Sequence, residues 1–537
     1  MNILRPIRLP TAALQNGVSL LTLCGSLVFA CGAQAATYYV AKTGSDSNNG
    51  SADSPWLTIG HAAKVVEAGG TVNVGAGTYH ESVLFENSGT AAAPIVFNGH
   101  GVAIIDGSTG VSCCTTPAFA ASNGFIGGNT MGLVNVGAAS GVNHLTIEGF
   151  TIQNFKTGSA AEAPVGVMIA GSGTGIQLLD NKIMNIQTTA GANGNAYGIA
   201  VFGSSATPLS VTVSGNTVTG CLTGESETVT FNGNVQNFVA SNNVIHDNDN
   251  IGMDAIGFEG VGPTGSDQAK NGDFYGNLIY NNSAYRNPGE GNSYDEDGLY
   301  CDGCTDITFE RNTVYGNDLG IEATSELPGR VGSNVIIRNN LIYANNSNGI
   351  SVGGYAKSGT GGSSNITIVN NSLYDNDTQE TGSGEFQIQY RATGILFENN
   401  IVQAGKQGLF VYGYVTGSGV ELNDNDYYTK SANTTFELNA KSYSTFAAYQ
   451  KATGQDKNSL YANPDYDEVP TCTSKSEKAA PTPITTCTAS NLDIPTSSPA
   501  EGRGNVTLGA EDFGTVDFNG HPRVGANGLI NIGAYEQ

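Results

Sequence analysis

Three acidic residues stand in short runs where aliphatic residues alternate with other side chains. They are Asp254, Asp302 and Glu322. Successive side chains of a β-strand point to opposite faces, so the aliphatic neighbours would face inward and the carboxylates outward. Carboxylates gathered on one face can serve as the acid and base of glycoside hydrolysis, or as oxygen ligands for a hard cation such as Ca²⁺.

The same alternation predicts two outward columns of side chains across successive strands. The first contains Asp254, Tyr300, Glu322, Ser351 and Phe410, with Gln387 on the strand between the last two. The second contains Asp302, Thr324 and Gln389. Strands lie about 4.8 Å apart and residues about 3.3 Å apart along a strand, so Asp254 and Glu322 would be roughly 9 to 10 Å apart and Asp302 about 8 Å from each. Such separations suit an inverting pair of carboxylates better than a retaining pair.

Basic, aromatic and amide side chains complete the predicted site. Lys357 or Arg391 would act as a base or neutralise an acidic sugar, which makes the catalytic candidates Asp254, Asp302, Glu322, Arg391 and Lys357. Substrate contacts are predicted for residues that offer a flat ring or an amide group: Tyr300, Tyr355, Gln387, Gln389 and Tyr390. A bound Ca²⁺ would take its oxygen ligands from four carboxylates: Asp254, Asp297, Asp302 and Glu322.

A repeated phrase of Asn, any residue and an aliphatic residue supplies the frame for these columns. It begins at Asn181, Asn216, Asn243, Asn277, Asn312, Asn340, Asn371 and Asn400. Such irregular but recurrent spacing is typical of a solenoid with a constant rung and loops of varying length. One strand precedes each Asn, a second follows it, and a third opens with Gly. We therefore predict an all-β, right-handed parallel β-helix whose Asn residues stack as a ladder and take the left-handed backbone of a tight bend.

The two ends of the chain indicate export and capping. Residues 1–35 are predicted to be a signal peptide, because Arg5 and Arg8 precede an apolar stretch and Ala33-Gln-Ala35 offers a cleavage site. Residues 36–110 would form the first rungs and a helical cap, 111–425 the coil with its cleft, and 426–537 a C-terminal cap packed on the last rung. No later stretch approaches 18 apolar residues, so we expect no membrane span and a secreted monomer, extracellular or periplasmic.

Net charge and cysteine content limit which classes of ligand the chain is expected to bind. The formal net charge of −25 excludes a general nucleic-acid binder, which needs clustered Lys and Arg. An acidic polysaccharide would be repelled unless a cation bridged the charges. Cys301 and Cys304 are expected to be a local disulfide or buried thiols rather than a metal site, and Cys472 and Cys487 could pair across a loop.

The chain resembles secreted bacterial β-helix proteins that act on carbohydrates, in particular the pectate lyases of polysaccharide lyase family nine. The resemblance covers the region from Tyr38 to Asp46 and the coil from about 160 to 410. It implies that the acidic segment Asp295-Glu-Asp297-Gly298 holds calcium. It also implies a catalytic Lys in the segment Asn348-Gly-Ile-Ser351-Val, where this chain has Ser351.

These observations favour a secreted enzyme that degrades a polysaccharide, most of all a calcium-assisted lyase acting on a uronic-acid polymer such as pectate. A lyase needs a base for the proton next to the carboxylate and a cation for the charge that develops. An inverting glycosidase that uses a carboxylate pair is the alternative enzyme. A non-catalytic glycan-binding or adhesin β-helix is the third possibility, because fold does not fix function.

Overall fold

A buried Asn fixes the bend between two strands in successive rungs. The structure, a computed structural model, describes residues 36–114, 129–291, 293–414, 417–475, 484–488 and 491–536, so the predicted signal peptide lies outside the described residues. In each bend the backbone N–H and the side-chain amide of one Asn donate to Oδ1 of the Asn on the next rung, as Asn277 does to Asn312 at 3.0 and 2.9 Å. The predicted ladder is confirmed and extends to Asn425.

We predicted that the ladder Asn would take the left-handed backbone of each bend, but this prediction is wrong. The residue before the ladder Asn is the left-handed one. Asn242, Arg311 and Asn339 have φ values of 54°, 54° and 57°. The ladder Asn itself must keep an ordinary backbone because both its N–H and its side chain bond along the coil axis.

A second Asn ladder lies five residues after the first, and the sequence prediction missed it. It contains Asn248, Asn282, Asn317, Asn345 and Asn376. It ends on Glu385, whose carboxylate accepts from the backbone N–H and the amide of Asn376 at 3.0 and 2.7 Å. The five-residue interval recurs in the sequence and was the available signal.

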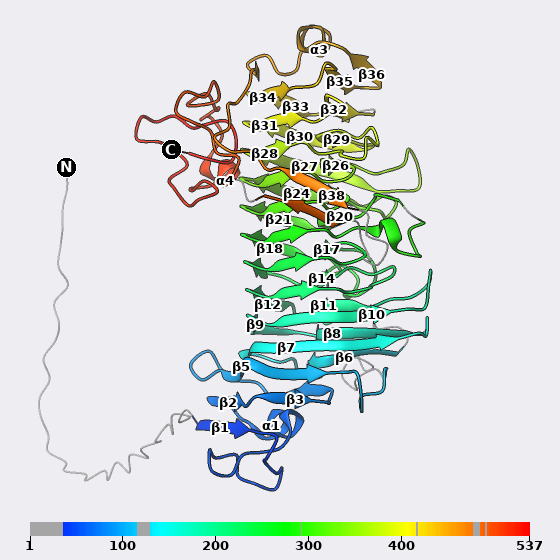
Figure 1. Cartoon of the computed structure of the whole chain (residues 1–537), viewed down its shortest axis with the longest axis vertical. Helices are drawn as coiled ribbons and strands as arrows, with labels where there is room; N and C mark the ends of the chain where they lie inside the picture. Colours follow the sequence, from blue (N-terminus) through cyan, green and yellow to red (C-terminus); the bar gives the residue numbers. More distant parts are fainter. Residues whose placement is uncertain are drawn as a thin grey trace, which may run out of the picture. The chain divides into compact units, whose positions relative to one another are not determined.

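The coil has three strands per rung, which form two sheets with parallel pairing along the coil (Figure 1). The first sheet wraps two faces. Its first face contains β1 (Ala36–Val40), β2 (Gly70–Val74), β5 (Ile95–Asp106), β7 (Leu145–Thr157), β9 (Gly173–Leu179), β12 (Leu209–Ser214), β15 (Val239–Ser241), β18 (Lys270–Tyr275), β21 (Thr305–Glu310), β24 (Val331–Arg338), β27 (Gly362–Val369), β30 (Ala392–Glu398) and β33 (Val420–Asn423). Its second face adds β3 (Gly77–Tyr79), β10 (Lys182–Thr188), β13 (Thr217–Thr219), β16 (Val244–His246), β19 (Leu278–Tyr280), β22 (Thr313–Tyr315), β25 (Leu341–Tyr343), β28 (Ser372–Tyr374), β31 (Ile401–Ala404), β34 (Asp426–Thr429) and β37 (Leu460–Tyr461).

The second sheet, named sheet C here, carries the Gly-opened strands. It contains β4 (Val83–Phe85), β6 (Asn129–Val136), β8 (Glu162–Ala170), β11 (Tyr197–Gly203), β14 (Val229–Gly233), β17 (Met253–Ile256), β20 (Asp297–Asp302), β23 (Leu319–Thr324), β26 (Asn348–Val352), β29 (Phe386–Ile388), β32 (Leu409–Gly413), β35 (Thr435–Leu438) and β36 (Lys441–Tyr443). Aliphatic and aromatic side chains from all three faces fill the interior. The predicted right-handed parallel β-helix is confirmed.

The open ends of the coil are covered by helices. As predicted, α1 (Ile59–Val65) packs its buried Ile59 and Ala62 on the first strands. At the other end, β35 and β36 pair antiparallel and α3 (Phe446–Thr453) follows, with the Tyr449 ring stacked on Phe436 at 4.6 Å. Two further short helices are η1 (Ala284–Arg286) and α4 (Ala510–Phe513).

The tail beyond α3 does not stay on the last rung, contrary to expectation. It runs back beside earlier strands of the first sheet (orange to red in Figure 1). There the side-chain amides of Asn339, Asn370 and Asn399 donate to tail carbonyls at 2.9 to 3.1 Å. The tail therefore satisfies polar groups that stand at the bends of the coil.

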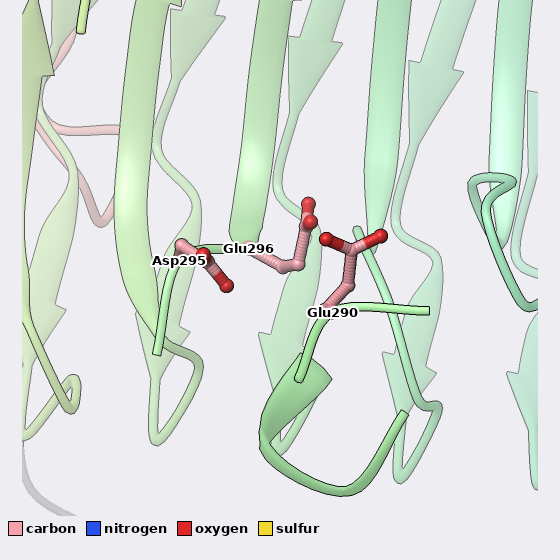
Figure 2. Close-up of side chains that lie close together, drawn as sticks. All are labelled: Glu290, Asp295 and Glu296. Carbon is pink, nitrogen blue, oxygen red and sulfur yellow. The ribbon is translucent and has the colours of Figure 1, made fainter. Parts of the chain in front are cut away.

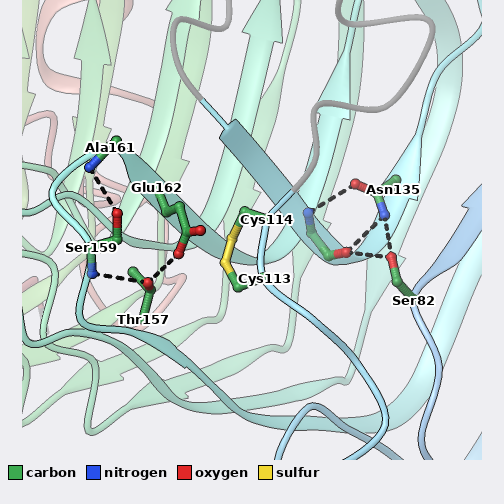
Figure 3. The surroundings of a disulfide bond; sticks show 9 residues. Ser82, Cys113, Cys114, Asn135, Thr157, Ser159, Ala161 and Glu162 are labelled. Atoms are coloured by element: carbon green, nitrogen blue, oxygen red, sulfur yellow. Dashed lines mark hydrogen bonds between the residues drawn. A yellow bond between two sulfur atoms is a disulfide. The ribbon is translucent and has the colours of Figure 1, made fainter.

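Three disulfides occur in the described residues. Cys301 and Cys304 are fully buried and bonded to each other, and Cys472 pairs with Cys487 across the hairpin of β38 (Cys472–Lys475) and β39 (Ile484–Cys487), so both pairings suggested by the sequence are present. The third joins the adjacent residues Cys113 and Cys114, beside Ser82 and Glu162 (Figure 3). Cys221 is free and buried.

Candidate active site

The register of sheet C builds the first predicted column. Asp254 on β17 pairs with Tyr300 on β20, Tyr300 with Glu322 on β23, and Glu322 with Ser351 on β26. Gln387 on β29 follows Ser351, which confirms this order. The second column pairs Asp302 with Thr324, also as predicted.

Phe410 was placed wrongly at the end of the first column. The register shifts between Leu409 and Val411, and Tyr412 pairs with Gln387 instead. The Phe410 side chain is fully buried in the core, where its ring stacks on Phe436 at 4.8 Å. Simple alternation fails at this irregularity because one strand turns two successive side chains inward.

The outward residues are buried rather than exposed. Asp254, Asp297 and Asp302 are 1%, 2% and 6% exposed, and Tyr300 is 4% exposed. Strand alternation faces most of these side chains away from the coil interior, but loops between the strands cover them. Burial of an ionised carboxylate costs free energy because the group loses hydration, so these residues bear on the stability of the fold as well as on chemistry.

The buried Asp297 and the half-buried Glu322 form a pair of carboxyl groups whose negative charges repel. Burial is the main cause that raises the pKa of Asp297 well above its usual value, and Glu322 is the first of its charged causes. Burial also raises the pKa of Glu322 to about 7, although Ser351 Oγ donates to Glu322 Oε1 at 2.7 Å and favours the ionised form. Asp297 Oδ1 has no hydrogen-bond partner. The two groups thus hold protons unequally, which is what an acid and a base require.

A cavity of about 410 Å³ lies over this pair. Its acidic lining consists of Glu290, Asp295, Glu296, Asp297, Glu322 and Glu326. Four of the five predicted substrate contacts also line it: Tyr300, Tyr355, Gln387 and Gln389. Among the described residues that line the cavity there is no Lys, Arg or His.

Three of these carboxylates form a separate group on the segment before β20. The ligand oxygens of Glu290, Asp295 and Glu296 lie within 4.8 Å of one another, and Figure 2 shows Glu290 and Glu296 turned toward each other. Carboxylate oxygens at this spacing suit a hard cation. The group shares the cavity with Asp297, one of the four predicted calcium ligands, whereas Asp254 and Asp302 do not line that cavity in the described structure. Calcium binding itself stays a prediction.

Asp254 and Asp302 belong to a second cluster of carboxyl groups beside the cavity. The Asp302 N–H donates to Asp254 Oδ1 at 3.4 Å, and the Glu326 N–H donates to Asp302 Oδ1 at 2.8 Å. Burial raises the pKa of Asp302 to about 8 and that of Glu227, a residue the sequence prediction did not name, also to about 8. Glu227 is the first charged cause that raises the pKa of Asp254.

The two predicted basic residues have different places. Arg391 braces the loop of residues 353–361: its guanidinium donates to the carbonyls of Gly361, Lys357 and Ala356 at 2.6, 3.0 and 2.8 Å, and to Thr360 Oγ1. The Arg391 guanidinium is therefore engaged by the loop that it braces. Lys357 lies exposed on that same loop.

The predicted aromatic contacts also separate. Tyr355, on the loop braced by Arg391, is 60% exposed and lines the cavity, so its ring is free to face a sugar. Tyr300 is buried, and its hydroxyl hydrogen-bonds Glu326. Tyr390 stacks on Tyr414 at 4.7 Å and is not among the described residues of the cavity lining.

Sequence reasoning missed several residues of the site. Glu290 lies on a loop outside the strand repeat, so no column predicted it, whereas Glu296 belongs to the acidic segment that the resemblance had assigned to calcium. Asn348 was quoted only for its resemblance to a lyase segment, yet it shares a register position with Leu319 and Asp297 across three strands. The run of three acids at Asp295-Glu296-Asp297 was the clearest available signal.

The comparisons identify relatives of the whole chain. The chain is 36% identical over 431 residues to the uncharacterized protein YwoF of Bacillus subtilis (strain 168), an alignment that spans 79% of this chain and 87% of YwoF. The chain belongs to the YwoF family. Within it, residues 140–358 match the family described as Right handed beta helix region, a stretch that includes every carboxylate of the cavity.

Solved structures are similar to this YwoF-family chain at low sequence identity. XylC, solved in complex with xylose, is 13% identical and superposes with a TM-score of 0.54 over 93% of this chain and 98% of its own. The pectate lyase Pel9A is 15% identical, with a TM-score of 0.44 over 94% of this chain and 97% of its own. No helix in the described part of the chain is long and apolar enough to cross a membrane.

Proposed function

We propose that this chain is an exported enzyme that hydrolyses a glycosidic bond with Asp297 and Glu322 as its acid and base. One observation carries the proposal: the buried Asp297 and the half-buried Glu322, whose negative charges repel, line one cavity whose described lining has no Lys, Arg or His. A proton abstraction next to a uronate would need a free base and a positive charge, and Arg391 is already bonded to its own loop.

The two groups would divide the chemistry by their protonation. Asp297 stays neutral and gives its proton to the glycosidic oxygen as the bond from that oxygen to the anomeric carbon breaks. Glu322, whose ionised form accepts a hydrogen bond from Ser351, removes a proton from the water that attacks the anomeric carbon. The register places their α-carbons roughly 11 Å apart, which leaves room between the side chains for a sugar and a water. XylC, which shares the fold, was solved in complex with xylose, and this supports a sugar ligand.

Product analysis tests the reaction type. The exported wild type and the variants Asp297→Asn and Glu322→Gln should be incubated with neutral and uronic polysaccharides, recording reducing ends and ultraviolet absorbance together. We expect new reducing ends without absorbance from the wild type, and a loss of at least about a hundredfold in each variant. Near-normal turnover in both variants would contradict the assignment. Glycan binding without any cleavage would favour the adhesin hypothesis.

A calcium-assisted uronate lyase is the second candidate, because the Glu290, Asp295 and Glu296 group offers oxygen ligands of the kind calcium prefers. These residues would hold the ion, which would stabilise the charge that forms beside a uronate. The exposed Lys357 is then the available base. Products that absorb ultraviolet light, lost with EDTA and restored by calcium, would replace the hydrolase with this function.

A further inference from the structure

Three buried side-chain oxygen atoms in the described lining of the cavity have no hydrogen-bond partner. Asp297 Oδ1, Asn348 Oδ1 and Gln389 Oε1 have no partner, and their side chains are 2%, 1% and 7% exposed. All three residues line the cavity. A buried polar atom without a partner costs free energy unless a ligand or water satisfies it, so these oxygens mark where donors are missing.

The orientation of both amides follows from their own bonds. Asn348 Nδ2 donates to Gln387 Oε1 at 3.2 Å, and Gln389 Nε2 donates to Gln387 Oε1 and to Ser351 Oγ at 3.1 Å each. Ser351 in turn donates its only hydrogen to Glu322. With the amide nitrogens engaged, the oxygens of Asn348 and Gln389 are the atoms left for a ligand.

The carboxyl groups of the cavity lining indicate which class of ligand could supply the missing hydrogen-bond donors. Six carboxyl groups line the cavity, and in its described lining no cation balances them. A uronate would add another negative charge and further acceptors to a site that already has both in excess. The hydroxyl groups of an uncharged sugar bring donors without that charge, and an exposed aromatic ring beside the cavity provides a surface on which a pyranose can stack.

We propose that this cavity is a binding subsite for an uncharged, hydroxyl-rich pyranose. Its hydroxyl groups would donate to the amide oxygens of Asn348 and Gln389 and would hydrogen-bond the neutral carboxyl group of Asp297, and its ring would face Tyr355. This inference rests on the proposed function, since it assigns the substrate class of the same site. It separates neutral glycans from the uronic polymers to which the sequence first pointed.

Binding to a silenced enzyme tests the inference apart from catalysis. Glu322→Gln should be titrated calorimetrically with xylohexaose, cellohexaose and hexagalacturonate, each with calcium and with EDTA. We expect a neutral hexasaccharide to bind at least about tenfold more tightly than hexagalacturonate under both conditions. Tighter binding of hexagalacturonate, uronate binding that depends on calcium, or no binding of either neutral probe would overturn the inference.

Substitutions locate the subsite. In the Glu322→Gln background, Asn348→Ala and Gln389→Ala should each weaken the neutral ligand about fivefold to tenfold, whereas Asn519→Ala, at an exposed turn of the C-terminal tail, should not. Gln389→Lys should improve hexagalacturonate binding relative to the neutral ligand. Unchanged affinity in both Ala variants would contradict the subsite. Neutral binding that responds to these variants, with no cleavage by the wild type, would leave the subsite standing and remove the hydrolase.

Discussion

The Asn ladders and the outer face of sheet C lie on the same rungs, but they differ in hydrogen bonding. Buried polar groups are paired along the ladders, whereas some of those on sheet C have no partner. Along the ladders every Asn from Asn243 to Asn371 bonds to the rung before and the rung after. On sheet C, carboxyl groups are buried beside one another, and Asp297 Oδ1 and Gln389 Oε1 have no partner.

The difference separates stability from function. A satisfied buried network rigidifies a fold, whereas a buried group without a partner costs stability and is retained where a ligand completes it. Substitution in the ladder should therefore destabilise without touching chemistry. Substitution on sheet C should do the reverse.

The largest stability effect is expected in the ladder. Asn312→Ala would leave the Asn277 N–H buried without its partner and would remove the side-chain bonds to Asn277 and to the Phe274 carbonyl, and should lower the free energy of unfolding by about 3 to 5 kcal/mol. Chemical denaturation measures this, with Asn519→Ala, at an exposed turn of the C-terminal tail, as control. A loss below about 1 kcal/mol would show that the ladder is not a major source of stability.

On sheet C, substitutions should lower the catalytic rate rather than the free energy of unfolding. Asp297→Asn and Glu322→Gln should lower kcat by at least about a hundredfold while the melting temperature at pH 8 stays equal or rises, because a neutral amide replaces a carboxyl group whose ionised form is disfavoured by burial. Wild-type activity should increase toward a pH of about 7 as Glu322 ionises, and fall again once Asp297 loses its proton. Thermal melts and a pH–rate profile check both expectations. A melting temperature that drops in both variants would make the pair structural.

A smaller effect, on KM, is expected for the loop of residues 353–361, to which the Arg391 guanidinium donates hydrogen bonds. Arg391→Lys would lose most bonds to the loop that carries Tyr355, so KM should rise about fivefold to tenfold with kcat within about twofold. Tyr355→Ala should act in the same direction, and Tyr355→Phe should restore KM. Lys357→Ala is the matched control on this loop. If it abolished activity, Lys357 would be the base and the lyase would be favoured.

The smallest effect is a slope of stability with pH. The pKa of Glu322 rises from 4.5 to about 7 and that of Asp302 from 3.8 to about 8, so the folded state binds protons more tightly than the unfolded state between these values. Stability from these groups is complete below about pH 4 and lost as the pH rises to about 8. The melting temperature should therefore decline from pH 5 to pH 8, and less steeply in Glu322→Gln. A rise over that interval in the wild type would contradict the burial argument.

The sequence predicted what repeats and not what interrupts the repeat. Asn phrases and Gly-opened strands fixed the rungs, so the order Asp254, Tyr300, Glu322, Ser351 and Gln387 followed from alternation alone. Alternation tells which way a side chain points, but not whether a loop covers it. The burial of Asp254 and the acidic loop at Glu290 were therefore beyond it.

The path of the C-terminal tail has a consequence for how the protein comes apart. In a solenoid each rung contacts only its neighbours, so melting can begin at either end and spread turn by turn. Here Thr485, Phe513, Asn531 and Asn505 bond to Asn281, Asn339, Asn370 and Asn399. The C-terminal tail thus hydrogen-bonds four separate bends of the coil. Unfolding that begins at the C-terminal end must first break these bonds. Rungs that would otherwise melt independently are joined into one cooperative unit, which includes the rungs that carry Asp297 and Glu322.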